Sequence, residues 1–108
     1  MMKRLIALAL GFSALPTTAH AEWINGNQLH EWCSSSNQYF ASQCMGYILG
    51  SLDATPELKT PENATRGQVR DVIVKYLREH PEHRDMPAGM VIIMAAFEAW
   101  PSYQQSKK

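Results

Sequence analysis

The stretch "CMGYILGSLDA", Cys44–Ala54, decides how the chain is expected to fold. Most of its residues are ordinary helix formers, yet Gly46 and Gly50 lie inside it, and an interior glycine costs about 0.5–1 kcal/mol relative to alanine. With Ser42 and Ala54, these glycines form a strip of small residues at i, i+4 spacing. Such a strip lets another helix approach closely. We therefore expect Gly46 and Gly50 to be helix-packing residues that face a bulky helix near the C-terminus.

Working outward from this stretch, the apolar spacing predicts four helices and no strand. They run from about Asn27 to Ser34, from about Gln38 to Ala54, from the N-cap Thr65 to the stop at His80-Pro81, and from about Pro87 to Trp100. Thr65 and Gln68 match a capping box. Asp85 is the expected cap of the last helix, and a polar tail follows Pro101. The predicted fold class is all-α, a small bundle of four to five helices.

The first 21 residues read as a secretory signal peptide rather than as part of the fold. Lys3 and Arg4 precede an apolar run over Leu5–Leu15, and Ala19-His20-Ala21 ends the segment in an A-x-A pattern. The run is too short to span a membrane, which takes about 20 apolar residues. We expect cleavage after Ala21, one domain over residues 22–108, a periplasmic location and no membrane span.

Cys33 and Cys44 are the only two cysteines, and both lie in the expected domain. Export and an even cysteine count favour one disulfide between them. A reactive thiol and a metal site are the alternatives. A domain of this size has a limited core, so a covalent link would contribute substantially to its stability.

Charge and motif content exclude several classes of function. The chain has 10 basic and 10 acidic residues, and the only basic run is Lys107-Lys108, so nucleic-acid binding has no electrostatic support. No nucleophile motif surrounds the serines or histidines. We predict no catalytic residue, no cofactor and no enzymatic activity.

The segment "HPEHRD", His80–Asp85, is the richest in chemistry. A zinc site needs three or four well-placed ligands, and Pro81 is expected to break the helical geometry that would align His80 with His83. We therefore predict no metal site. The other two interpretations are a solvated connection between helices and a loop that contacts a protein partner.

The chain resembles the Rap/Tai family of periplasmic immunity proteins, which protect bacteria from peptidoglycan amidases of type VI secretion. The matching pieces are "NGNQLHEWC" (25–33), "CMGYILGSLDA" (44–54), "GQVRDVIVKYLREHPEHRDMPA" (67–88) and "AAFEAWP" (95–101). Two positions depart from the family pattern. Many members have a cysteine before the proline of Lys59-Thr60-Pro61, and many end in W-P-C where this chain has Trp100-Pro101-Ser102. Both departures are consistent with the loss of one whole disulfide.

The resemblance implies a small all-helical fold, often a homodimer, that binds a protein toxin and blocks the cleft of its amidase active site. In such families the loops between helices make much of this contact. The candidate toxin-binding residues here are His80, Glu82, His83, Arg84 and Asp85.

Two other functions stay open at the level of sequence. One is a periplasmic stress chaperone that exposes apolar surface in acid, with His30, His80 and His83 as groups that gain charge between pH 8 and 5. The other is an accessory envelope protein without inhibitory activity.

Overall fold

The computed structural model describes residues 23–105, so the expected signal peptide lies outside the described residues. The elements are α1 (Gly26–Ser34), α2 (Gln38–Asp53), α3 (Arg66–Glu79), the 3-10 turn η2 (Pro81–His83), α4 (Ala88–Ala99) and α5 (Pro101–Gln105). Residues 23–105 contain no strand, and Asn25 and Pro87 form one isolated antiparallel bridge. The predicted all-α bundle is confirmed. The segment after Trp100 is polar, as expected, but its described part forms the short helix α5.

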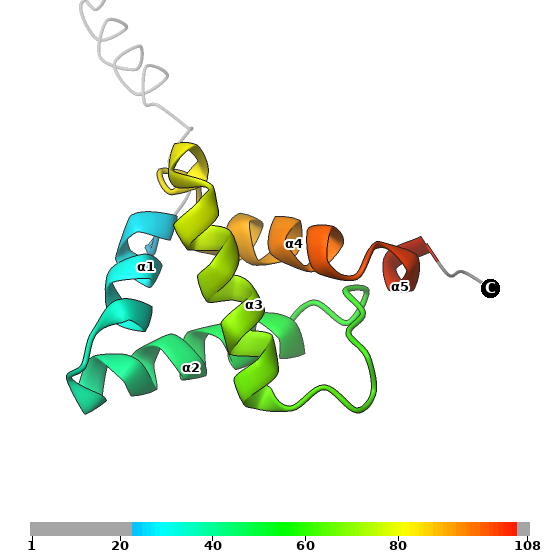
Figure 1. The fold of residues 1–108 in the computed structure, drawn as a ribbon, viewed down its shortest axis with the longest axis horizontal. Helices are drawn as coiled ribbons and strands as arrows, with labels where there is room; N and C mark the ends of the chain where they lie inside the picture. The colour runs from blue at the N-terminus through cyan, green and yellow to red at the C-terminus, as the bar shows by residue number, and fades with distance from the viewer. Residues whose placement is uncertain (1–22, 106–108) are drawn as a thin grey trace, which may run out of the picture.

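The helices form two packed pairs that meet in one core. α1 packs mainly on α2, and α3 packs mainly on α4, while α1 also contacts both α3 and α4. Figure 1 shows α3 crossing in front of α2, with α4 leading away to α5. None of the helices between residues 23 and 105 is long and apolar enough to cross a bilayer.

The buried core follows the apolar periodicity of the sequence. α3 buries one stripe at helical spacing, and α4 buries small and branched residues on the face toward α3. Full burial of one large aliphatic side chain stabilises the fold by about 1.5–3 kcal/mol. The buried hydrophobic residues are Leu29, Cys33, Cys44, Ile48, Val69, Ile73, Tyr76, Leu77, Ala88, Val91, Ile92, Ala95 and Ala96.

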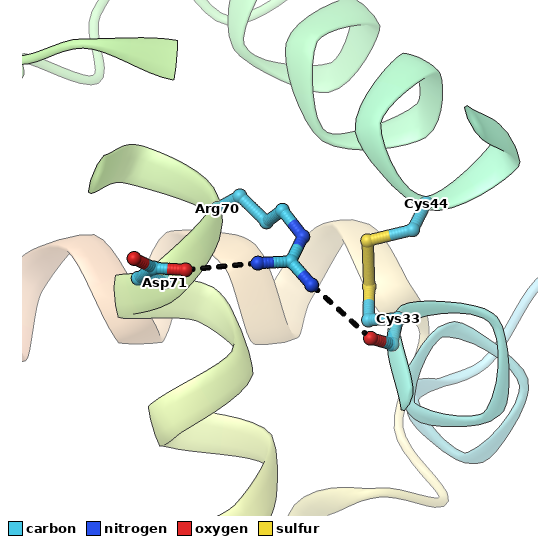
Figure 2. Close-up of a disulfide and its surroundings, with 4 residues drawn as sticks. All are labelled: Cys33, Cys44, Arg70 and Asp71. Carbon is cyan, nitrogen blue, oxygen red and sulfur yellow. Dashed lines mark hydrogen bonds and ion pairs between the residues drawn. A yellow bond between two sulfur atoms is a disulfide. The ribbon is translucent and has the colours of Figure 1, made fainter. Parts of the chain in front are cut away.

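The disulfide predicted from the cysteine count is confirmed. Cys33 at the end of α1 and Cys44 in α2 are joined at an S–S distance of 2.08 Å, and both are buried. Figure 2 shows the Arg70 guanidinium of α3 beside this link, between the Asp71 carboxylate at 2.8 Å and the Cys33 carbonyl oxygen at 3.4 Å. Arg70 therefore ties α3 to the C-terminal end of α1, where a backbone carbonyl has no partner within its own helix.

Side-chain caps set the starts of α1, α2 and α3, but not that of α4. The Asn25 and Asn37 side chains cap α1 and α2, and the Thr65–Gln68 capping box at the start of α3 is confirmed with both of its hydrogen bonds. The predicted Asp85 cap of α4 is wrong. Pro87 takes the N-cap position without a side-chain hydrogen bond.

The prediction that Gly46 and Gly50 pack against another helix is also wrong. A Cβ added at either position would meet no heavy atom within 4 Å among the residues described. The reason is that α4 packs mainly on α3 and only weakly on α2. Met90 and Phe97, two of the bulky side chains of α4, are 45% and 52% exposed.

The α2–α3 connection is fastened to α5 by one side chain. The Gln104 amide oxygen accepts from the Lys59 backbone N–H at 3.0 Å, and the Gln104 amide nitrogen donates to the Lys59 carbonyl at 2.7 Å. Thr60 and Ser102, the two positions that depart from the pattern of the family that the chain resembles, lie one residue from Lys59 and two residues from Gln104. A reciprocal hydrogen-bond pair thus joins the two segments in which the second pair of cysteines is missing.

Candidate functional site

The loop between α3 and α4 gathers the five candidate side chains, His80, Glu82, His83, Arg84 and Asp85. His80 closes α3 as its C-cap and starts η2, so the candidate residues begin directly at a helix end. In Figure 1 this segment, in yellow, lies at the end of α3 that points away from α2. Glu82 and Asp85 are exposed, while His80, His83 and Arg84 are half-buried.

His80 lies between two carboxylates that come from different elements. Its Nδ1 is 3.1 Å from Glu82 Oε2 in η2, and its Nε2 is 3.1 Å from Glu98 Oε1 in α4. The hydrogen bond with Glu82, followed by that with Glu98, raises the pKa of His80, although partial desolvation opposes this shift. The pKa of Glu82 is lowered by a hydrogen bond from its own backbone and then by His80. His80 therefore braces the loop against α4.

Tyr76 connects His83 to the core. The Tyr76 hydroxyl is 2.9 Å from His83 Nδ1, and it donates to Met94 Sδ at 3.8 Å. The Tyr76 ring also lies on the His80 ring, with centroids 4.2 Å apart. Burial, with smaller contributions from Glu98 and Glu82, raises the pKa of Tyr76, so its hydroxyl stays protonated in neutral solution.

The structure brings His80 and His83 together, contrary to the expectation that Pro81 would separate them. Their ring centroids are 5.3 Å apart and their planes differ by 8°. The reason is that Pro81 opens a 3-10 turn, in which side chains three residues apart lie above one another. The argument that excluded a metal site on this ground is therefore wrong.

The Arg84 side chain is hydrogen-bonded to the end of α3. Its Nε donates to the Leu77 carbonyl at 2.7 Å, and its NH2 group reaches the Arg78 carbonyl at 3.4 Å. These acceptors are in the last turn of α3, where carbonyls lack helical partners and a positive charge is favourable. The guanidinium therefore caps α3 and is only partly available to a partner.

The end of the loop is also joined to the start of α1. The Gly26 N–H donates to the Met86 carbonyl at 2.9 Å, and the Asn27 N–H donates to the Arg84 carbonyl at 2.7 Å. A Cβ on Gly26 would lie 2.8 Å from both Cα and the carbonyl oxygen of Arg84. Only glycine permits this approach of two backbones. The loop is consequently held on a rigid frame made of α1, α3 and α4.

A second surface feature was missed by sequence reasoning. An open groove on α1 and α2 is lined by Trp32, Tyr39, Ser42, Gln43, Gly46 and Tyr47. Its signal was present in the sequence, because the stretch Gln38–Leu52 contains no charged residue although α2 has an exposed face. The strip of small residues predicts packing within the chain for that face, but Gly46 and Gly50 are exposed.

The described part of the chain is thus a small, disulfide-linked all-α domain with a polar loop fixed between helix ends. The sequence model of the Rap1a immunity proteins matches residues 25–102, which covers nearly all of that domain. The chain belongs to the Rap1a immunity protein family, and this confirms the resemblance noted in the sequence. Membership indicates an immunity function against a type VI effector. Comparison with curated proteins gives no match, and comparison with solved structures gives none.

Proposed function

We propose that this protein is a periplasmic immunity protein that binds a type VI secretion peptidoglycan amidase and blocks its active site. The match of residues 25–102 to an immunity family is the observation that carries the proposal. The Cys33–Cys44 disulfide supports export, since disulfides persist in oxidising compartments. The proposal includes a signal peptide over residues 1–21, cleavage after Ala21 and a single immunity domain over residues 22–108.

The loop His80–Asp85 is the proposed toxin-binding surface. Glu82 and Asp85 present carboxylates to solvent, and His80 and His83 add ring edges that can form hydrogen bonds. Hydrogen bonds to α1, α3 and α4 fix the loop before binding. A fixed loop loses little conformational entropy on association, and this supports tight binding.

We propose that the protein acts by binding alone and catalyses no reaction. Immunity protein families are generally non-enzymatic. Both cysteines of the chain are in the disulfide, so neither offers the thiolate that nucleophilic catalysis requires.

Co-expression tests the proposal directly. Cells that export the partner amidase, which we expect to be encoded beside this gene, should lyse without the protein and survive with it, and the two proteins should co-purify. Equal death with and without the protein, together with no co-purification, would refute the inhibitory function.

Reversing the charge of single carboxylates in the same co-expression assay tests whether the loop His80–Asp85 contacts the toxin. Glu82→Lys and Asp85→Lys should reduce protection, because both carboxylates are exposed on the proposed surface. Glu57→Lys is the matched control, since Glu57 is an exposed carboxylate of the α2–α3 connection. Equal protection by all three variants would place the contact elsewhere, and the α2 groove would be the next surface to test.

A homodimer, which the resemblance implies, is part of the same proposal. The exposed Met90 and Phe97 of α4 give it a candidate face. Sedimentation velocity should then give about twice the mass of the cleaved chain, and a monomer at all concentrations would contradict the dimer.

The chaperone and accessory alternatives predict different behaviour. An acid-activated chaperone should bind an apolar dye and suppress client aggregation at pH 2–3, which is the acid range in which such proteins open. A protein that keeps its fold in acid and protects no cell from the amidase would instead fit an accessory envelope role.

A further inference from the structure

The side chains of His80, Glu82 and His83 converge on one small volume beside η2. His80 Nδ1 is 3.1 Å from Glu82 Oε2, and His83 Nε2 is 3.9 Å from the same oxygen. The three atoms all lie within 4.8 Å of one another. In a four-coordinate zinc site, ligand atoms are about 3.3 Å apart, because each lies about 2.0–2.1 Å from the ion. Two of the separations are already close to that value.

The third separation, between the nitrogens of His80 and His83, is at most 4.8 Å and has to shorten through rotation of the two imidazoles. Glu82 is exposed, and the side chains of His80 and His83 are 27% and 35% exposed. No buried contact has to break for Glu82 to rotate toward both imidazoles. The backbone already supplies the required framework, since His80 and His83 flank a single turn of 3-10 helix.

The outer partners of the two imidazoles leave the inward nitrogens free to bind a cation. Both His80 nitrogens face carboxylates at 3.1 Å, Nδ1 on Glu82 and Nε2 on Glu98. Metal binding requires the tautomer in which Nε2–H donates to Glu98 and Nδ1 offers its lone pair. The Tyr76 hydroxyl donates to Met94, and its oxygen can accept a proton from His83 Nδ1–H. His83 Nε2 then keeps its lone pair as well.

This arrangement is the one that metal-binding histidines show in general. A ligating histidine usually donates its second N–H to a carboxylate, a carbonyl or a hydroxyl, and this fixes its tautomer and orientation. Glu98 supplies that contact for His80, and Tyr76 supplies it for His83. Two imidazoles and one carboxylate favour zinc and the neighbouring first-row divalent ions over magnesium or calcium.

We propose that His80, Glu82 and His83 form a binding site for one divalent transition-metal ion, with Zn²⁺ as the best-suited ion. Glu98 and Tyr76 act as positioning residues. The remaining coordination positions open toward solvent. The ion lies between His80 Nδ1 and the Glu82 carboxylate and joins both ends of η2. The proposal is independent of whether the loop binds a toxin.

The alternative cluster of Glu79, His80 and Glu98 is the weaker candidate. It offers only one imidazole, and it uses the His80 nitrogen that faces α4. The two clusters can be separated by experiment, because Glu79 belongs to the second alone.

Calorimetric titration of the untagged full chain with zinc chloride tests the proposal. We expect one ion per chain, removed by a chelator. His83→Gln and Glu82→Gln should abolish or strongly weaken binding, and Glu98→Gln should weaken it by about tenfold to a hundredfold, as is usual for loss of an outer partner. His30→Gln and Glu79→Gln should bind as the wild type does, because neither residue belongs to the proposed set. Circular dichroism confirms that each variant is folded.

A spectroscopic measurement identifies the ligands directly. Electron paramagnetic resonance of the Cu²⁺-loaded wild type should show coupling to two imidazole nitrogens, and His83→Gln should show one. No saturable zinc binding by the wild type, or equal binding by the folded His83→Gln variant, would overturn the proposal.

Discussion

Gly26 is the residue at which the loop and the first helix come closest. Its backbone N–H donates to the Met86 carbonyl, and its missing side chain leaves room for the Arg84 backbone. Gly46 and Gly50, by contrast, face open space. All three glycines lie in helices, but only Gly26 is required by a close contact between two backbones.

Substitution by alanine should separate these roles. Gly26→Ala should lower the free energy of unfolding by about 1–3 kcal/mol, because the new Cβ would lie 2.8 Å from backbone atoms of Arg84. Gly46→Ala is the matched control and should raise it by about 0.5–1 kcal/mol, since alanine favours the helix and nothing obstructs its Cβ. Urea unfolding measures both, and a stabilised Gly26→Ala variant would contradict the close approach.

His30 makes stability depend on pH. Its Nδ1 is buried without a hydrogen-bond partner among residues 23–105. Burial lowers the pKa of His30, and the positive charges of Arg84 and Arg78 lower it further. The unfolded chain therefore binds a proton at this residue more readily than the folded chain does. Neutral His30 makes its full contribution to the free energy of unfolding at pH values above about 6.5, which is the pKa of a histidine in the unfolded chain. That contribution is lost as the pH falls below this value towards the lower pKa of the folded chain.

Comparison with His30→Gln isolates this effect. We expect the wild type to be more stable relative to His30→Gln at pH 7.5 than at pH 5.5, the two conditions that bracket the titration. Other groups, including His80, are common to both proteins and cancel in the difference. A difference in unfolding free energy that does not change with pH would show that His30 titrates alike in both states.

At the scale of elements, α5 acts as a fastener for the α2–α3 connection. Gln104→Ala removes both hydrogen bonds with Lys59 and should cost about 1 kcal/mol net, because water replaces part of each lost bond. Hydrogen exchange measures the effect locally, and the backbone amides around Lys59 should exchange faster in Gln104→Ala than in the wild type.

Gln104→Glu is the control for that prediction. A carboxylate can still accept from the Lys59 N–H, but it cannot donate to the Lys59 carbonyl. Exchange should therefore lie between that of the wild type and that of Gln104→Ala. Unchanged exchange in both variants would mean that α5 does not hold the connection.

Elements that depend on neighbours in the sequence could be predicted, and those that depend on distant contacts could not. Thr65, Gln68 and Pro81 set both ends of α3 locally. The cap of α4 could not be inferred, because its first turn is fixed by the Ala88 N–H donating to the Ile24 carbonyl. The environment of Gly46 and Gly50 depended on whether α4 packs on α2 or on α3, which helical periodicity does not encode.

For the candidate site, too, the local features could be predicted from the sequence and the contacts between helices could not. Its residue types and its place between two helices were evident from "HPEHRD". The contacts of His80 with Glu98 and of His83 with Tyr76 join residues of different helices, and the sequence gives no measure of those distances. Arg84 was expected to contact a partner, but most of its hydrogen bonding goes to α3.

At the scale of the whole molecule, one disulfide and one core hold the five α-helices of residues 23–105 so that a polar loop is fixed at one end. This design suits a protein that acts by presenting a preformed surface to a partner. Inhibition of peptidoglycan cleavage by the purified neighbouring amidase is the most direct test of that function. We predict complete inhibition near one immunity protein per toxin, with Glu82→Lys much weaker than Glu57→Lys. Full amidase activity in the presence of excess wild-type protein would contradict the account.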